Sequence, residues 1–385
     1  MSVSAEVASA TNQQLAPVVD DLSAFVLGGR LQSRLPHHVA NETDVRTPAQ
    51  GFADAVDAER IGFRRVWLSE RFNIKEAATL LSGMAAHTTR LEVGTGVIRS
   101  SDRHPKLMAA TAATMQACYG DRFVLGLGQG EAEYNRVALG LAEAPGYPGL
   151  IDYVDILRRL WRGETIEYDG RAGSFHGLAL GDVYHGGPPP VWYGSFGGPR
   201  AAAAVARAFD GIMLCPLLTP EATANARRNI DQACERVGRD PASVRVAQCV
   251  VTAADLDEYE TRQQTYARAV TYMQIEHWAK ATVRVNGWDL VPANKLREFD
   301  KFKGMASADE HFHRRDLMDA TDLIPDEWIE ATCAVGSASD CVRKFEEFSD
   351  AGADEIITYG TTPGQNAGVV AAWRDRGTPQ RKAAR

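Results

Sequence analysis

The fold is decided by a stretch that reads Gly94-Thr95-Gly96-Val97, then Arg103-His104-Pro105, and finally Asp121-Arg122-Phe123-Val124-Leu125-Gly126-Leu127-Gly128-Gln129-Gly130-Glu131. The order predicts a strand, a helix that begins at a proline, and a second strand. Both strands end in glycines, which let the backbone come close to a flat, anionic ligand. This stretch is therefore interpreted as a cofactor-binding βαβ unit.

The same alternation of short apolar runs and amphipathic helices continues along the whole chain. Proline opens several of the expected helices, and Thr47 with Gln50 forms a capping box at Pro48. Helices between strands imply parallel pairing, and eight such units favour a closed (β/α)8 barrel over an open sheet. The expected strands are Ala24–Gly29, Arg65–Glu70, Leu91–Arg99, Phe123–Gly128, Val191–Ser195, Gly211–Pro216, Val244–Thr252 and Glu355–Tyr359.

The motifs, in this order and at this spacing, resemble those of the bacterial luciferase-like superfamily. The resemblance extends from about Leu22 to Arg376, nearly the whole chain. It implies a (β/α)8 TIM barrel that binds FMN or its deazaflavin relative, coenzyme F420. The run Gly128-Gln129-Gly130-Glu131 looks most like the F420-dependent branch.

Composition limits the possible partners and compartments. The 385 residues, 45% of them hydrophobic, can bury the core of one large domain. With 42 basic and 50 acidic residues the net charge is −8, which argues against nucleic acid or a membrane as a partner. The six cysteines show no zinc-binding spacing, so we expect no metal and reduced thiols. A cytoplasmic protein is expected.

One barrel domain, 21–376, is predicted between a flexible N-terminal tail (1–20) and a basic C-terminal tail (377–385). Insertions are expected after the fourth strand (Ala132–Tyr147) and after the seventh (Asp255–Asp322). The second, a helical insertion rich in aromatic residues such as Tyr272 and Trp278, is interpreted as a lid or dimer surface.

The resemblance assigns roles to the glycine motifs. In the family, a non-proline cis peptide at the end of the third strand presses on the cofactor ring, and here it would join Gly96 to Val97. Gly94, Thr95, Gly128 and Gly130 are expected to contact the same ring. An ordinary glycine bulge is the alternative. A Rossmann fingerprint is excluded, because its third glycine is replaced by Glu131.

A second glycine-rich turn precedes an alanine-rich helix and contains Gly194, Ser195, Gly197 and Gly198. A helix N-terminus offers free N–H groups and a partial positive charge, so these residues are predicted to hold the cofactor phosphate. Arg99, with Arg103 and His104, is expected near the glutamate-bearing tail of the cofactor, although solvated residues at a helix start are the simpler alternative.

Three residues are candidates for the chemistry. By resemblance, Glu131 is the acid/base that moves the proton accompanying a hydride. Glu70 and Arg71 close the second strand where many relatives have an acid followed by a histidine base. Arg71 cannot accept a proton, but it can stabilise an oxyanion during reduction of a ketone or enone. A charge cluster of Glu70 and Arg71 that fixes the strand end is the structural alternative.

The leading hypothesis is a coenzyme F420-dependent oxidoreductase acting on a small, apolar carbonyl or enone substrate. The alternatives are a two-component FMN monooxygenase of the same superfamily, fed reduced flavin by a partner reductase, and a non-catalytic flavin-binding protein. A flavin or F420 reductase that supplies the reduced cofactor is an expected partner. The family resemblance also implies a homodimer.

Overall fold

The computed structural model describes residues 15–29, 46–70, 75–130, 136–137, 140 and 146–376. Within them, eight parallel strands close into a barrel in the order β1, β2, β3, β5, β8, β9, β10 and β12, and β12 pairs again with β1. The predicted (β/α)8 barrel is confirmed. The strands are β1 (Leu22–Phe25), β2 (Arg65–Leu68), β3 (Glu92–Thr95), β5 (Phe123–Gly128), β8 (Val191–Ser195), β9 (Gly211–Leu214), β10 (Arg245–Ala254) and β12 (Glu355–Tyr359).

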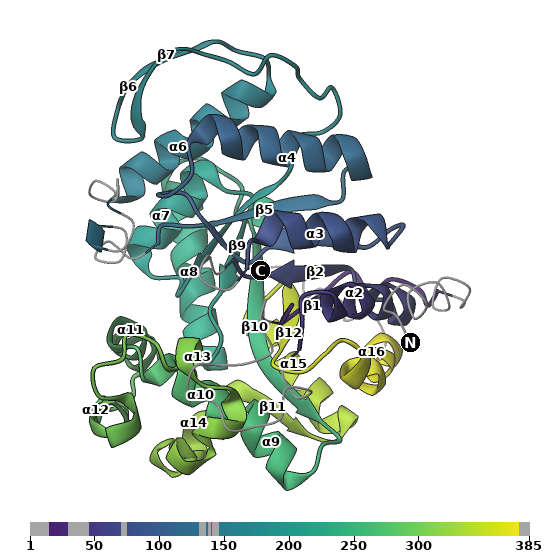
Figure 1. Ribbon diagram of the computed structural model, residues 1–385, viewed down its shortest axis with the longest axis vertical. Coiled ribbons are helices and arrows are strands. Elements are labelled where there is room, and N and C mark those ends of the chain that lie inside the picture. The colour runs from purple at the N-terminus through teal and green to yellow at the C-terminus, as the bar shows by residue number, and fades with distance from the viewer. Residues whose placement is uncertain are drawn as a thin grey trace.

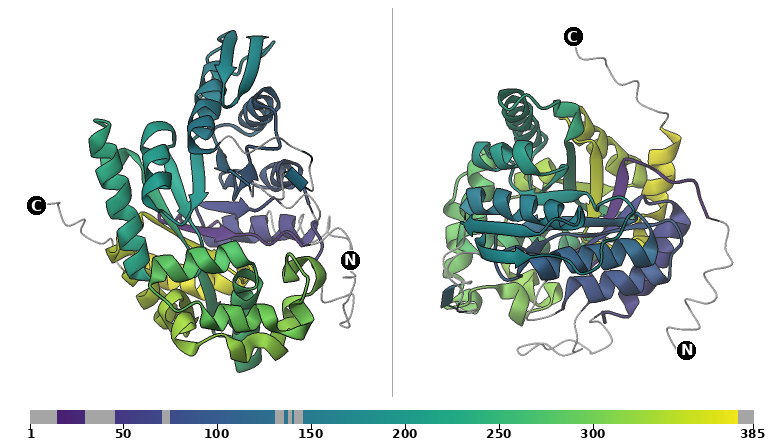
Figure 2. Two further views of the ribbon diagram at one scale, coloured as in Figure 1. Left: turned by 90° about the vertical axis from the view of Figure 1, so that its left-hand side faces the viewer. Right: turned by 90° about the horizontal axis from the view of Figure 1, so that it is seen from above.

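Helices surround this barrel on the outside (Figures 1 and 2). Prolines stand in the first turn of α4, α7 and α8, where a missing N–H costs no hydrogen bond. The strands are almost wholly buried, because both of their faces are covered. The surrounding helices are α2 (Gln50–Ile61), α3 (Ala77–Ala86), α4 (Pro105–Tyr119), α6 (Gly146–Trp161), α7 (Pro199–Ala208), α8 (Pro220–Arg236), α15 (Ala338–Asp350) and α16 (Ala367–Asp375).

The interior of the barrel is filled by aromatic rings around a buried cation. The guanidinium of Arg65 lies 5.2 Å from the ring centre of Trp67 and 5.1 Å from that of Trp192. Arg65 is only 3% exposed and pairs with Glu92 at 2.5 Å and Glu355 at 3.5 Å. Since these acids begin β3 and β12, the ion pairs close the end of the barrel where the strands start.

The predicted insertion after the seventh barrel strand is helical, as expected, but longer than 255–322. It extends to Thr332 and ends in β11 (Cys333–Gly336), which pairs with the far half of β10. In Figure 1 it lies at the opposite end of the molecule from α4 and α6. Its helices are α9 (Glu258–Gln264), α10 (Tyr266–Met273), α11 (Glu276–Asn286), α12 (Val291–Glu298), the 3-10 helix η3 (Asp300–Phe302), α13 (Ala308–His311), the 3-10 helix η4 (Arg314–Leu323) and α14 (Asp326–Thr332).

Three features differ from the sequence-based expectation. A hairpin of β6 (Ile166–Gly170) and β7 (Gly173–Leu178) was missed and stands beyond α6 in Figure 1. The third predicted strand is divided into β3 and the short β4 (Ile98–Arg99). The predicted flexible tail, 1–20, includes residues that are packed on the barrel, because Val19 is buried and donates its N–H to the Gly62 carbonyl. The rest of that tail, 1–14, and residues 377–385 lie outside the described residues, as does most of the first insertion.

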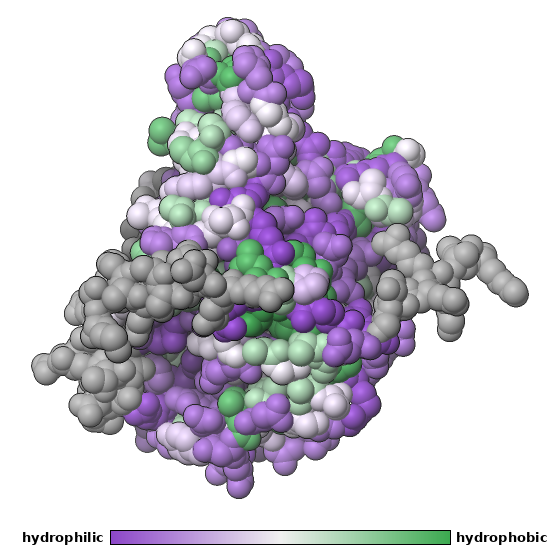
Figure 3. Space-filling view, turned by 90° about the vertical axis from the view of Figure 1, so that its right-hand side faces the viewer, coloured by the Kyte–Doolittle hydropathy of each residue, from purple (hydrophilic) through white to green (hydrophobic). Residues whose placement is uncertain are grey.

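The face drawn in Figure 3 is mainly hydrophilic, with apolar residues gathered across its middle. No helix in the described part of the chain is long and apolar enough to cross a membrane.

Candidate active site at the barrel mouth

The break between β3 and β4 lies at the carboxyl ends of the strands, which form the mouth of the barrel. The peptide bond between Gly96 and Val97 is cis, as the resemblance implied. The Gly96 N–H donates to the Leu68 carbonyl at 2.8 Å, and the Val97 carbonyl accepts from the Glu70 N–H at 3.4 Å. Gly96 and Val97, called the bulge below, are therefore hydrogen-bonded to the end of β2.

The glycines around the bulge make room for the side chain of Val97. A Cβ atom built on Gly128 would lie 2.8 Å from one Val97 methyl, and a Cβ on Gly194 would lie 2.8 Å from the other. A Cβ on Gly94 would lie 2.6 Å from the ring of Trp67. Close packing within the protein thus already requires glycine at these positions, so their presence alone does not indicate a ligand.

Thr95 joins β3 to β5 where the two strands separate. Its hydroxyl donates to the Gly126 carbonyl and accepts from the Gly126 N–H, both at 2.8 Å. Thr95 is fully buried. One side chain therefore replaces two ladder hydrogen bonds and fixes the bulge against the neighbouring strand.

The N-terminus of α7 lies beside the bulge, at the end of β8. Gly197 has a φ of +71°, and a Cβ there would collide with Ala226 of α8, so only glycine fits. Gly198 is the N-cap of α7 and has no protein atom within 4 Å of an added Cβ. Arg200 follows, with its guanidinium 5.7 Å from the ring centre of Tyr147. Free N–H groups, open space and a cation fit the phosphate of a flavin-like cofactor.

A cluster of charged side chains surrounds the end of β2. The carboxylate of Glu70, 2% exposed, lies 2.6 Å from Nη2 of Arg103 and accepts the Ala77 N–H at 3.3 Å. Arg103 also reaches Glu76 at 2.9 Å. Burial raises the pKa of Glu70 in spite of Arg103. The strand end is therefore held by an ion pair of Glu70 with Arg103, whereas the predicted cluster of Glu70 with Arg71 stays a prediction because Arg71 lies outside the described residues.

The other predicted residues near this cluster are also engaged. Nε of Arg99 lies 2.9 Å from Asp102, whose pKa is raised by burial. His104 caps α4 by accepting the Lys106 N–H at 3.2 Å. Gly130 has a φ of +72°. Arg71 and Glu131 lie outside the described residues, so their roles remain predictions.

An aromatic wall covers one side of the mouth. It consists of Phe25 and Tyr359 from the barrel, Phe196 from the turn before α7, and Tyr272 and Trp278 from the insertion. The rings of Phe25 and Tyr359 lie 5.0 Å apart, those of Tyr272 and Trp278 5.1 Å, and those of Phe196 and Trp278 5.2 Å. The hydroxyls of Tyr272 and Tyr359 are 2.7 Å apart. The insertion is thus packed against the mouth itself.

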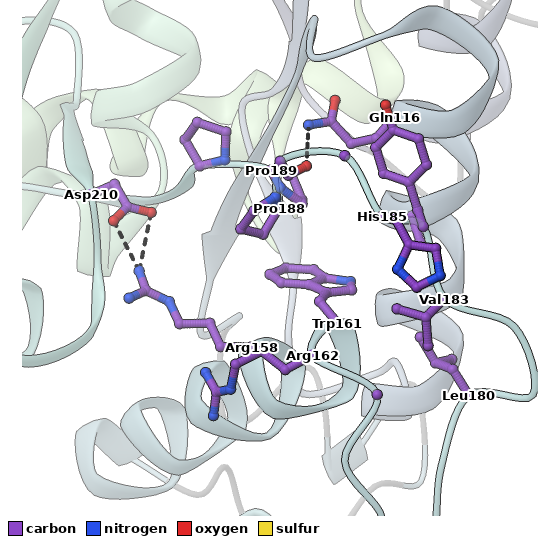
Figure 4. Close-up of a pocket in the computed structure, with 16 residues that line it drawn as sticks. Gln116, Arg158, Trp161, Arg162, Leu180, Val183, His185, Pro188, Pro189 and Asp210 are labelled. Carbon is purple, nitrogen blue, oxygen red and sulfur yellow. Dashed lines mark hydrogen bonds and ion pairs between the residues drawn. The ribbon is translucent and has the colours of Figure 1, made fainter.

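A separate groove of about 950 Å³ lies at the other end of the barrel strands, where β8 and β9 begin. Figure 4 shows Arg158 paired with Asp210 on one side and Trp161, from the end of α6, facing the prolines that precede β8. The groove shares no residue with the mouth. Among the described residues, no group of three or more His, Cys, Asp and Glu side chains is arranged to hold a metal.

Comparison with known proteins identifies the family. The sequence profile of the family described as luciferase-like monooxygenase matches residues 31–355. The chain belongs to the luciferase-like monooxygenase family. This luciferase-like chain is 24% identical over 301 residues to a 5,10-methylenetetrahydromethanopterin reductase of Archaeoglobus fulgidus, and the match covers 78% of this chain and 86% of that protein.

Two further proteins that are similar to this luciferase-like chain, one in sequence and one in fold, are F420-dependent by name. An F420-dependent glucose-6-phosphate dehydrogenase of Mycolicibacterium gilvum is 34% identical over 153 residues, 38% of this chain and 45% of that protein. The fold matches the coenzyme F420-dependent tetrahydromethanopterin reductase from Methanopyrus kandleri with a TM-score of 0.72 and 19% identity, covering 92% of this chain and 97% of that one.

Sequence reasoning missed several residues of the luciferase-like mouth. Phe25 and Tyr359 were recognised only as strand residues, although each is the last residue of a parallel strand and therefore faces the mouth. The position of Thr95 in a glycine run was noticed, but its bridge to Gly126 was not. No pattern in the sequence indicated the pair of Glu70 and Arg103.

Proposed function

We propose that the protein is a coenzyme F420-dependent oxidoreductase that moves a hydride between the deazaflavin and a carbonyl or conjugated enone substrate with a largely apolar body. The proposal is carried by the match to a 5,10-methylenetetrahydromethanopterin reductase over 78% of the chain, together with the 34% identity to an enzyme named as an F420-dependent glucose-6-phosphate dehydrogenase. The fold places the site at the barrel mouth. The aromatic wall at that mouth supports an apolar substrate body. When bound, F420 would supply or accept the hydride.

The residues that would hold the cofactor come from two adjacent parts of the mouth. Gly194, Ser195, Gly197 and Gly198 would present the N-terminus of α7 to the phosphate, because Gly198 leaves open space there. The bulge at Gly96 and Val97, braced by Thr95, would support the ring. We place the glutamate tail near Arg99, beyond β4.

Three charged residues would serve the chemistry. Glu131 would move the proton to or from the substrate oxygen, and Arg71 would stabilise the oxyanion that forms as hydride adds. Glu70 is buried and bound to Arg103 and to the start of α3, so we assign it a positioning role. Arg71→Gln should lower kcat and leave cofactor affinity unchanged, whereas unchanged turnover would remove Arg71 from the mechanism.

An FMN-dependent monooxygenase is the second candidate, because the family is described by that activity. A phosphate site at α7 fits both cofactors. We favour F420 on the names of the relatives. The proposal includes a homodimer, a separate reductase that supplies reduced cofactor, and a cytosolic location consistent with six unpaired cysteines.

Turnover separates the two candidates. Under anaerobic conditions, reduced F420 should be oxidised when ketones or enones are added, with recovery of the deazaflavin absorption band. Glu131→Gln should slow this reaction by about a hundredfold or more, with F420 affinity unchanged. Oxygen-dependent turnover with reduced FMN, and none with reduced F420, would reverse the assignment.

A further inference from the structure

Two arginines of the insertion point into the aromatic side of the mouth. Arg268 lies on α10 and is 6% exposed, and Arg314 begins η4 and is half-buried. Nη1 of Arg268 donates to the Tyr359 hydroxyl at 3.3 Å, and its guanidinium lies 4.8 Å from the centre of that ring. Nη1 of Arg314 donates to the Gly360 carbonyl at 3.2 Å. Both cations therefore lie where β12 ends.

Among the residues that the structure describes, neither arginine has an acidic partner. Their hydrogen bonds go to a phenol and a backbone carbonyl, and the buried Nε of Arg268 has no hydrogen-bond partner. The barrel contains a contrasting case, because Arg65 is just as buried but is neutralised by Glu92 and Glu355. A buried cation without an anion is costly, so the buried Arg268, with the half-buried Arg314 at the same strand end, requires an explanation.

The electrostatic environment of Arg314 also favours the binding of a neutralising anion. Burial lowers the pKa of Arg314, and the neighbouring charge of Arg268 lowers it further. A guanidinium remains protonated in proteins, so both groups keep their charge and repel one another. One anion between them would remove the repulsion and satisfy the open donors.

Arg268 is joined to the segment at Gly96 and Val97 by a chain of packed aromatic rings. Arg268 contacts Tyr359, the ring of Tyr359 packs on Phe25, and Phe25 lies 3.0 Å from where a Cβ on Gly96 would be. A small molecule held at Arg268 would therefore extend along these rings toward the peptide bond that we propose supports the cofactor.

We propose that Arg268 and Arg314 bind an anionic group, a carboxylate or a phosphate, of the substrate that exchanges hydride at this mouth. Arginine suits both anions because its planar donors match two oxygens at once. The apolar body of the substrate would lie against the aromatic wall. This inference rests on the proposed function and adds that the substrate is an anion.

Calorimetry with three related probes tests the proposal on the full chain, with and without F420. Phenylacetate and benzylphosphonate are anions, and phenylacetamide is a neutral analogue. At least one anion should bind about tenfold more tightly than the amide, as two charge-assisted hydrogen bonds would require. A preference for phenylacetate assigns the site to a carboxylate, and a preference for benzylphosphonate to a phosphate. Equal binding of all three probes would overturn the proposal.

Variants show whether the arginines cause the preference. Arg314→Met should abolish it, and Arg268→Lys, which keeps the charge in a buried position, should weaken it. Arg262→Met is the matched control, because Arg262 belongs to the same insertion but pairs with Asp322 and donates to Thr321 at 2.8 Å. Circular dichroism verifies folding. A preference that survives both mouth variants contradicts the proposal.

The F420 titration of the same variants separates the substrate from the cofactor. Their F420 affinity should equal that of the wild type. A tenfold loss of F420 affinity with the probe preference intact would assign the arginines to the cofactor and overturn the proposal. If the wild type binds no F420 but still prefers the anions, the proposed function fails and the anion site stands.

Discussion

Glu70 and Arg103 face each other at the entrance to the barrel, with 2.6 Å between Oε2 and Nη2. They are 33 residues apart in the chain. The pair joins the end of β2 to the segment before α4, and through Glu76 it also holds the start of α3. The backbone N–H of Glu70 donates to the Val97 carbonyl, so this charge cluster is also hydrogen-bonded to the bulge.

The two acids of this cluster should show opposite pH dependences. Burial raises the pKa of Glu70 above its ordinary value of 4.5, so the folded protein holds this proton more tightly than the unfolded chain. The stability that this proton contributes is complete below pH 4.5 and is lost as pH rises through the folded pKa. The unfolding free energy of the wild type, relative to Glu70→Gln, should therefore fall as pH rises from 4.5.

Glu76 is the matched control for that experiment. Burial raises the pKa of Glu76, but hydrogen bonds from the Thr79 and Ala78 N–H groups outweigh it, and the net pKa is lowered. The wild type should lose stability relative to Glu76→Gln as pH falls below 4.5. Urea titrations at several pH values measure both differences, and slopes of the same sign would contradict this description of the cluster.

Thr95 should be essential to the stability of the mouth. Thr95→Val keeps the shape but leaves the N–H and carbonyl of Gly126 without their partner, which should lower the unfolding free energy by about 2 to 4 kcal/mol. Thr95→Ser retains the hydroxyl and should cost less. Equal losses for valine and serine in denaturant titrations would show that the bridge is unimportant.

The contact between Gly194 and Val97 gives a test by compensation. Gly194→Ala puts a Cβ 2.8 Å from a Val97 methyl and should lower the unfolding free energy by about 1 to 3 kcal/mol. Adding Val97→Ala removes the collision, so the double variant should be more stable than the sum of the single changes. Gly181→Ala, which meets no atom within 4 Å, should be neutral. Strict additivity would contradict the packing argument.

A substitution at Gly198 should change the affinity for the cofactor but not the stability of the fold. Gly198→Ser has space for its side chain and provides a good N-cap for α7, so the melting temperature should be unchanged. The side chain would occupy the proposed phosphate position and should weaken F420 binding about tenfold. Gly181→Ser, equally open but after β7, serves as the control. Unchanged F420 affinity in Gly198→Ser would move the phosphate elsewhere.

The sequence predicted regular elements better than contacts. Phe123–Gly128 and Val191–Ser195 are strands with the predicted ends, because glycine or proline bounds them. The first strand begins two residues before the predicted Ala24, at Leu22. The hairpin at Ile166 was detectable from its alternating residues and from the glycines, Gly170 and Gly173, that flank the turn at Arg171-Ala172.

The site was harder to predict because its contacts join distant segments. The glycines at 128 and 194 looked like ligand contacts, but the space that they leave is filled by Val97, which lies between β3 and β4. Arg268 and Arg314 stood in an insertion without any motif, so only the folded chain brings them to Tyr359. Periodicity reports local structure, whereas such pairs depend on how strands are arranged around the barrel.

Cofactor choice tests the central claim most directly. The purified protein should be titrated with F420 and, separately, with FMN, while tryptophan fluorescence is followed. The account predicts saturable F420 binding with a dissociation constant on the order of micromolar, and FMN binding at least about tenfold weaker. Tight binding of FMN without binding of F420 would contradict it.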